Sequence, residues 1–184
     1  MVLEGNDRET IAACQRGDRD AFRALFEAYQ DKVYSIALRY TGDPAAALDI
    51  AQDTFLKLLS SIQNFRGDSG FDTWLYRLVV NRCFDDRRRG RRLLRFVEGV
   101  LDTFRAPGES AFDEIARGEV SSEVQSMVAR LSPEQRMVVV LRYTEGLSYE
   151  EIAEILGCSS GTVASRLNRA HKILERRLSH LRRS

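Results

Sequence analysis

The chain has 184 residues, with 28 Lys and Arg against 27 Asp and Glu, so its net charge is close to zero. The length allows one ordinary domain or two small ones, and the charge balance excludes a uniformly basic coat for nucleic acid. No apolar run is long enough to cross a bilayer and no signal peptide opens the chain, so we expect a cytoplasmic protein without membrane insertion.

Helical periodicity dominates the first half of the chain, where apolar residues recur every three or four positions. The first helix is expected to begin at residues 11–14, and the next three are expected at residues 21–40, 44–65 and 71–89. Asp20 is predicted to cap the second helix, and Pro44 suits the first turn of the third. The third helix is expected to turn inward Ala47, Ile50, Ala51, Phe55, Leu58, Leu59 and Ile62. The pattern predicts a helical domain over residues 1–95.

Charge is segregated along the rest of the chain. Residues 96–120 mix Gly and Pro with acidic residues, which is typical of a linker. A second helical domain is expected over residues 121–184, where Ser132 and Gln135 form a capping box. The segments 82–95 and 166–184 each hold seven basic residues. Two basic segments separated by an acidic one indicate two contacts with one polyanion, and the alternative interpretation is solvated helix faces. The predicted fold is therefore all-α, with two small helical domains joined by an acidic linker.

The C-terminal domain carries a helix-turn-helix pattern. A capping box at Ser148 and Glu151 opens one helix, Gly157 ends it, and Ser159 or Ser160 caps the next helix after a short turn. Polar and cationic side chains face outward on this last helix, as on a helix that enters a DNA major groove. The residues expected to contact DNA are Ser160, Thr162, Ser165, Arg166, Arg169 and Lys172. A plain amphipathic hairpin with a basic face is the alternative.

Two further surfaces are expected in the N-terminal domain. On the third helix, Asp49, Gln52, Asp53 and Lys57 share a polar face that is suited to a cationic partner, unless it is only a solvated face. The fourth helix combines aromatic and basic side chains, which suits opened single strands. Trp74 is favoured as a packing residue over a stacking one, because it falls at core spacing and a large ring is usually buried.

Three stretches of the chain resemble the sigma-70 superfamily, specifically its small extracytoplasmic-function group. Residues 131–136, 146–153 and 161–167 are similar to the domain that reads the promoter −35 element. Residues 49–55 are similar to the polymerase-binding helix. Residues 71–77, with Asn81 and Arg87, are similar to the helix that reads the −10 element. Three strings in the right order and spacing make the resemblance specific.

The resemblance implies a sigma factor that binds core RNA polymerase, through its β′ and β subunits, and directs promoter-specific initiation on double-stranded and then single-stranded DNA. It also implies an anti-sigma partner. The residues that it assigns to polymerase binding are Asp49, Gln52, Asp53, Phe55 and Lys57. Those assigned to the −10 element are Asn64, Arg66, Asp68, Trp74, Arg77, Asn81, Arg87 and Arg88. The loop from Asn64 to Gly70 is implied to hold an extruded base. The outward residues of the last helix are assigned to the −35 element.

The sequence departs from the family pattern at Ala164, where many members have Lys, and at His171, where Arg is usual. Both changes remove a cation from the recognition helix, so fewer phosphate contacts are expected there. Cys14, Cys83 and Cys158 are too widely spaced for a metal motif and are expected to be buried reduced thiols.

No catalytic residue, metal or cofactor is expected, and two other classes of function compete with the sigma factor. A dimeric helix-turn-helix regulator would bind operators without polymerase. A metal-dependent nuclease would draw on converging carboxylates among Asp49, Asp53, Asp72, Asp85 and Asp86.

Overall fold

The computed structural model describes residues 7–97 and 127–181, and all regular elements in these two ranges are helices. The N-terminal group contains α1 (Asp7–Gln15), α2 (Arg19–Thr41), α3 (Pro44–Ser61), the short 3₁₀ helix η1 (Ile62–Asn64) and α4 (Phe71–Val97). The C-terminal group contains α7 (Pro133–Thr144), α8 (Tyr149–Leu156) and α9 (Ser160–Leu181). The all-α prediction with two helical domains is confirmed. The predicted linker lies almost entirely outside the described residues.

Local capping signals place most helix ends. Capping boxes open α7 at Ser132 and α8 at Ser148, as the sequence predicts, and Gly157 ends α8 in the left-handed conformation with φ 63°. The prediction that Asp20 caps α2 was wrong. The cap is Asp18, whose Oδ1 accepts hydrogen bonds from the backbone N–H groups of Asp20 and Ala21 at 2.9 and 3.1 Å. Asp18 and Asp20 are both residue types that cap a helix. Asp18 is the N-cap because α2 begins at the next residue, Arg19.

One residue predicted to be in the core of α3 is exposed instead. Leu58 is fully buried, whereas its neighbour Leu59 is 53% exposed. Consecutive residues on a helix point about 100° apart, so a narrow buried stripe admits one of the pair and turns the other to solvent. Cys14 and Cys83 are buried free thiols, as predicted, while Cys158 is only half-buried. Burial raises the pKa of the Cys83 thiol, which keeps it protonated.

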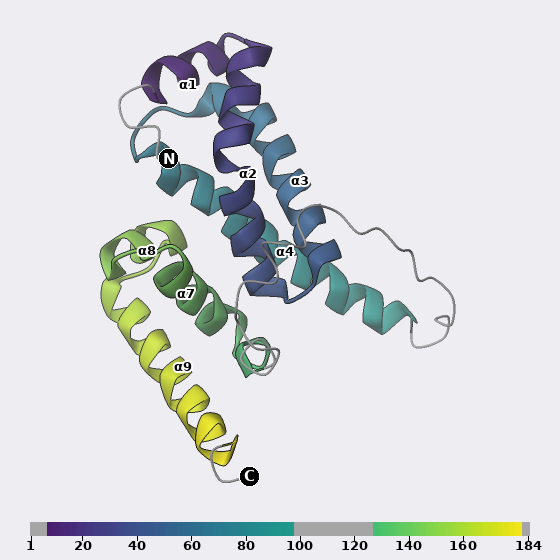
Figure 1. Cartoon of the computed structure of the whole chain (residues 1–184), viewed down its shortest axis with the longest axis vertical. Helices are drawn as coiled ribbons and strands as arrows, with labels where there is room; N and C mark the ends of the chain where they lie inside the picture. Colours follow the sequence, from purple (N-terminus) through teal and green to yellow (C-terminus); the bar gives the residue numbers. More distant parts are fainter. Residues whose placement is uncertain (1–6, 98–126, 182–184) are drawn as a thin grey trace.

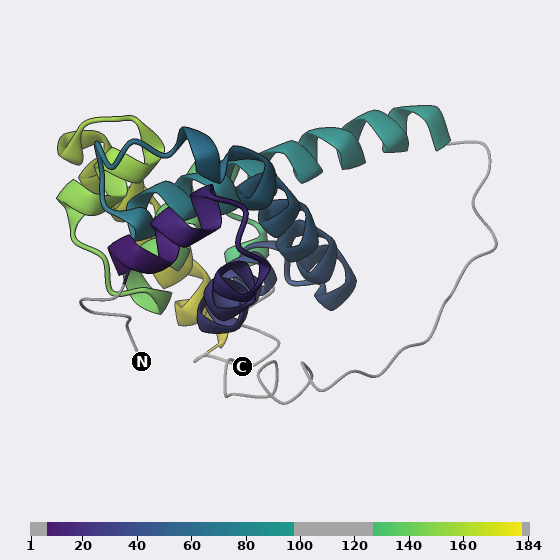
Figure 2. The same cartoon turned by 90° about the horizontal axis from the view of Figure 1, so that it is seen from above.

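The two groups of helices pack against each other, α2 on α7 and α4 on α8, and their buried side chains form one continuous cluster. Figure 1 shows α7 and α8 lying alongside the N-terminal helices. Figure 2 shows the second half of α4 extending beyond both groups. No helix in the two described ranges is long and apolar enough to cross a bilayer. The packing brings the first turns of α4, which the sequence predicts to contact DNA, against α8.

Candidate nucleic-acid and polymerase interface

An exposed stripe runs along α3 and is both acidic and apolar. Asp49 and Gln52 are exposed and Asp53 is half-buried. Leu56 is 65% exposed and, with the exposed Leu59, continues this stripe at the helical spacing of three and four residues. Sequence reasoning missed both leucines, because an apolar residue near a helical core stripe is normally assigned to that stripe. An exposed leucine pair beside carboxylates is a common composition for a protein-binding surface.

The other two residues assigned to polymerase binding lie away from this stripe. Lys57 is exposed, but it lies to one side of the row formed by Gln52 and Leu56. Phe55 is 6% exposed, and its ring packs edge-on against that of Phe26 with the centroids 4.7 Å apart. The Phe55 side chain therefore packs α3 against α2 and is not exposed to a partner in this arrangement.

The carboxylates of the nuclease alternative are divided between two places. Asp49, Asp53, Asp85 and Asp86 line one small hollow between α3 and α4, together with the guanidinium-bearing Arg82. Asp72 lies elsewhere and accepts a hydrogen bond from the Tyr29 hydroxyl at 2.6 Å. Among the residues that the structure describes, no group of three metal-ligating side chains is placed to hold an ion.

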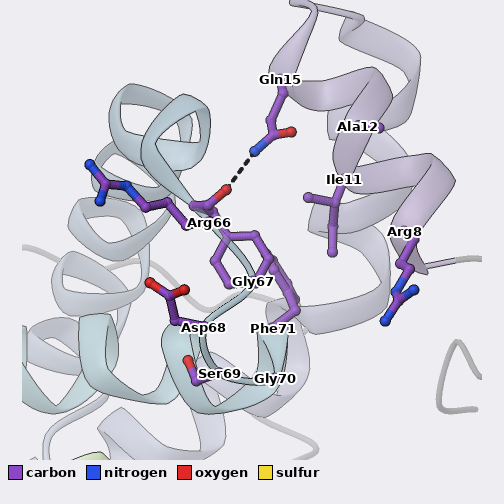
Figure 3. A pocket seen from close by; sticks show the side chains of 11 residues that line it. Arg8, Ile11, Ala12, Gln15, Arg66, Gly67, Asp68, Ser69, Gly70 and Phe71 are labelled. Atoms are coloured by element: carbon purple, nitrogen blue, oxygen red, sulfur yellow. Dashed lines mark hydrogen bonds between the residues drawn. The ribbon is translucent and has the colours of Figure 1, made fainter.

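The loop between η1 and α4 borders a pocket of about 660 Å³ (Figure 3). Arg66 and Asp68, both predicted to contact DNA, line this pocket. Trp74 packs as the sequence favours, because its ring centroid lies 5.2 Å from that of Phe65 and 5.8 Å from that of Phe71. The three rings form an aromatic cluster that holds both ends of the loop. Asn64 is exposed in the last turn of η1.

Helix α1 also lines this pocket, which no sequence motif indicated. Its last residue, Gln15, donates two hydrogen bonds from Nε2, to the backbone oxygens of Ile62 at 3.1 Å and Phe65 at 2.8 Å. The dashed line in Figure 3 marks a bond of this side chain to the loop backbone. These hydrogen bonds join segments that are almost fifty residues apart in the sequence, so a local sequence pattern cannot predict them.

Arg77 on α4 is engaged by the C-terminal group of helices. Its Nε and Nη2 donate to the backbone oxygen of Glu154 at 3.2 and 3.0 Å, and Nη2 also pairs with the Glu154 carboxylate at 3.3 Å. Asn81, one turn further along α4, is exposed. The side chains of Arg87 and Arg88 lie outside the described part of the chain. In this arrangement the −10 assignment of Arg77 requires the guanidinium to change partners.

A half-buried acid, Glu145, lies at the same domain contact. The Tyr76 hydroxyl donates to the Glu145 carboxylate at 2.9 Å, and the Lys32 ammonium lies 5.6 Å from the Tyr76 ring. Burial raises the pKa of Glu145, a shift opposed by the Tyr76 hydrogen bond and by the charges of Lys32 and Arg39. Burial also raises the pKa of Tyr76, which keeps its hydroxyl a donor.

The raised pKa of Glu145 predicts a pH-dependent domain contact. Protonated Glu145 stabilises the packed arrangement of the two helical groups, because packing raises the pKa of this carboxyl. The stabilisation is complete below the ordinary pKa of 4.5 and is lost as the pH rises through the raised pKa. Glu145→Gln keeps an acceptor for Tyr76 but carries no charge, so its domain contact should not respond to pH in this window. Small-angle scattering across a pH series measures the separation of the two groups of helices. An identical response of the wild type and Glu145→Gln would contradict this assignment.

The helix-turn-helix is formed by α8 and α9, and Ser159 is the residue that caps α9. Its Oγ accepts a hydrogen bond from the Thr162 backbone N–H at 3.2 Å and lies 3.0 Å from the Thr162 hydroxyl. Ser160 is the first residue of the helix and is exposed. The Ser165 hydroxyl donates to the Thr162 backbone oxygen at 2.9 Å. The small polar residues at this end therefore bond to one another and to the backbone.

The cationic residues of α9 differ in solvent exposure and in their contacts. Arg169 and Lys172 are exposed on one face. Arg166 is half-buried and turns back toward Cys158, with Nη1 3.8 Å from Sγ. His171, which departs from the family pattern, has its Nε2 2.7 Å from the hydroxyl of the exposed Tyr143. Arg169 and Lys172 therefore present exposed cations on one face of α9, whereas Arg166 is partly withdrawn from solvent.

Arg136 on α7 connects the two groups of helices from a buried position. Its Nη1 donates to the Tyr40 backbone oxygen at 2.8 Å, and its Nε donates to that of Val128 at 3.1 Å. Nη2 donates to the Ala129 backbone oxygen, and the guanidinium lies 5.4 Å from the centre of the Tyr40 ring. A charge that is 7% exposed is stable here because backbone carbonyls satisfy it.

Comparisons with known proteins agree with this arrangement. The model of Sigma-70 region 2 matches residues 25–93, and that of Sigma-70 region 4 matches residues 121–174. The RNA polymerase sigma-H factor of Pseudomonas aeruginosa is 36% identical over 191 residues, which cover 100% of this chain and 99% of that protein. The ECF RNA polymerase sigma-E factor of Escherichia coli (strain K12) is also 36% identical, with 98% of each chain covered.

Two solved structures have a similar fold. CnrH in complex with the cytosolic domain of CnrY superposes with a TM-score of 0.69 at 27% identity, over 95% of this chain and 97% of that chain. The sigma factor RpoE of Bartonella quintana, in complex with the anti-sigma factor NepR, gives a TM-score of 0.68 at 25% identity, over 86% of this chain and 96% of that chain.

Proposed function

The chain belongs to the sigma-70 family, in its extracytoplasmic-function group, and we propose that its DNA-reading surfaces are the pocket loop with α4 for the −10 element and α9 for the −35 element. The protein is a sigma factor that binds core RNA polymerase and directs promoter-specific initiation. Its family consists of transcription regulators. We place its action in the cytoplasm, where polymerase and DNA meet.

Core polymerase is proposed to dock on the exposed stripe of α3. The stripe offers the carboxylates of Asp49 and Asp53 to a cationic surface and the exposed Leu56 and Leu59 to an apolar one. Complementary charge accelerates and orients an encounter, while apolar contacts at the centre of an interface supply most of its free energy. Phe55 contributes by holding α3 in place from the core. The proposal that core polymerase docks here is based on the presence of carboxylates and exposed leucines on the same stripe.

The −10 element is proposed to enter the pocket beside the loop. An extruded base there meets the aromatic cluster below and the polar side chains of Asp68 and Ser69 at the side. Stacking on rings and hydrogen bonds to base edges are the interactions that hold an unstacked base. Arg77 and Asn81 extend this surface along α4. Arg77 reaches DNA only after it leaves Glu154, and we propose that the two helical groups separate when the promoter is bound.

The −35 element is proposed to receive α9 in its major groove, with the later turns of the helix on phosphates. Arg169→Ala should therefore weaken binding to duplex −35 DNA by a similar factor for every sequence. It should also lower the slope of log affinity against log salt by about 0.9, the value for one lost phosphate contact. Titration of the holoenzyme with labelled duplex at several salt concentrations measures both. Arg130→Ala, which removes an exposed cation outside α9, is the matched control. A loss confined to one base pair would assign Arg169 to base reading instead.

An anti-sigma protein is proposed as the second partner. The two similar structures hold partner proteins, the cytosolic domain of CnrY and the anti-sigma factor NepR. In this chain the two groups of helices pack together, with Tyr76 hydrogen-bonded to Glu145 and Arg77 paired with Glu154. A protein that keeps these groups together, or that covers the α3 stripe, would prevent transcription.

Reconstituted transcription tests the proposed function as a whole. Purified protein is added to core RNA polymerase on a genomic template, and the transcript starts are sequenced. We expect starts downstream of a shared pair of −35 and −10 motifs. The dimeric-regulator alternative predicts instead that the free protein shifts operator DNA in a gel without polymerase. Tight binding by the free protein together with no polymerase-dependent starts would overturn the proposal.

A further inference from the structure

The pocket beside the loop has a second wall, which α1 provides. Arg8, Ile11, Ala12 and Gln15 line it from α1, opposite the loop residues 66–70 (Figure 3). Its volume of about 660 Å³ falls within the range of sites that enclose small organic groups. Helix α1 precedes residues 25–93, the part of the chain that the region 2 model matches. This wall is therefore additional to the sequence that the family model describes.

Gln15 fixes the backbone at the point where the loop begins. A side-chain amide has two N–H donors, and Nε2 of Gln15 uses its donors on the carbonyls of Ile62 and Phe65. The loop itself contains Gly67 in the left-handed conformation with φ +77°, and no atom lies near the position of a Cβ there. The tip is thus open, and its position depends on its two ends. The aromatic cluster holds these ends together from below, and Gln15 holds the first of them from α1.

Arg8 gives the α1 wall a positive charge. Its side chain is exposed, and in Figure 3 it lies on the opposite side of the pocket from Arg66. A nucleotide whose base enters the pocket leaves its phosphates at the rim, where a guanidinium can neutralise one of them. Two cations on opposite sides of the rim suit a strand that passes across the pocket.

We propose that α1 belongs to the −10-binding surface, with Gln15 as the positioning residue of the base-holding loop and Arg8 as a contact to a phosphate of the opened strand. The proposal rests on the proposed function, because it requires the pocket to receive a base. It extends that function to a helix that neither the sequence motifs nor the family model assigns to DNA.

The test uses holoenzyme and fork-junction DNA whose single-stranded −10 segment carries 2-aminopurine at one position at a time. We expect the fluorescence of the wild-type complex to change at the position whose base enters the pocket. Gln15→Ala should lose that positional response and weaken fork-junction binding about tenfold, the equivalent of about 1.4 kcal/mol. Gln15→Glu is nearly isosteric but has no donor for the two carbonyls, so it should behave like Gln15→Ala. Core binding and duplex −35 binding should stay unchanged in both variants.

Arg8→Ala should lower the salt slope of fork-junction binding by about 0.7, the value for one phosphate of a single strand. Arg23→Ala, an exposed cation on α2 outside the pocket, is the control and should leave the slope unchanged. The role of α1 is overturned if both Gln15 variants keep the positional fluorescence response of the wild type. It is also overturned if both variants lose affinity uniformly, for core polymerase as well as for fork-junction DNA. A wild-type holoenzyme with no positional response at all contradicts the pocket in the proposed function, and this proposal falls with it.

Discussion

Replacing Leu56 by Lys should weaken the binding of core RNA polymerase about thirtyfold or more. Leu56 is 65% exposed, so the new side chain remains in solvent and the free protein keeps its fold. In the complex, the substitution removes an apolar contact and places a cation on a stripe whose carboxylates are proposed to face cations. Truncation of a central interface residue costs about 2 kcal/mol, which corresponds to thirtyfold, and the added repulsion increases that loss.

Equilibrium binding of labelled protein to core polymerase, followed by fluorescence anisotropy, measures this effect. Ala28→Lys adds the same charge to an exposed position on α2 and is the matched control. Circular dichroism should give the same helix content for both variants and the wild type. Wild-type affinity in Leu56→Lys would show that the exposed leucines of α3 face solvent in the holoenzyme, and the docking surface would have to be sought elsewhere.

Arg136→Leu should lower the free energy of unfolding by about 3 kcal/mol and separate the two groups of helices. The change leaves three backbone carbonyls without their charged donor, and the one that is buried is that of Tyr40 at the end of α2. Hydrogen bonds to a charged group contribute about 1.5–3 kcal/mol, and a buried polar group that loses its partner keeps the cost of its desolvation. Because Tyr40 belongs to the other helical group, part of the loss is a loss of domain contact.

Chemical denaturation measures the free energy, and the radius of gyration from small-angle scattering measures the separation. Arg136→Lys keeps the charge without the planar fork of donors, so it should fall between the wild type and Arg136→Leu. Arg130→Leu changes an exposed arginine six residues earlier and should unfold like the wild type. An unchanged radius of gyration in Arg136→Leu would mean that apolar packing alone holds the domains together.

Features that depend on neighbours in sequence could be predicted, and features that depend on distant neighbours could not. The capping boxes at Ser132 and Ser148 and the turn at Gly157 are local, so the residue types alone place them. Leu59 was assigned to the wrong side of α3 because adjacent apolar residues compete for one narrow stripe. The same ambiguity concealed the apolar half of the proposed docking surface.

The contacts across the domains are the part that sequence reasoning missed entirely. The bond of Arg77 to Glu154 joins residues 77 positions apart, and that of Arg136 to Tyr40 joins residues 96 positions apart. Such pairs follow from how whole helices pack, which a single sequence does not reveal. Arg77 was predicted to contact DNA, and its bond to Glu154 was not foreseen. Its contact with DNA remains a prediction.

The continuous core shared by the two helical groups has a consequence for the lifetime of the protein in the cell. The separation proposed for promoter binding takes α4 away from α8, and the apolar side chains between them then lose their cover. Exposed apolar surface of this kind promotes aggregation, and open chains are cut by proteases in proportion to their population. A copy released from polymerase must close again, find another partner or be degraded. The cellular amount of this protein should therefore follow the supply of its partners as well as its own rate of synthesis.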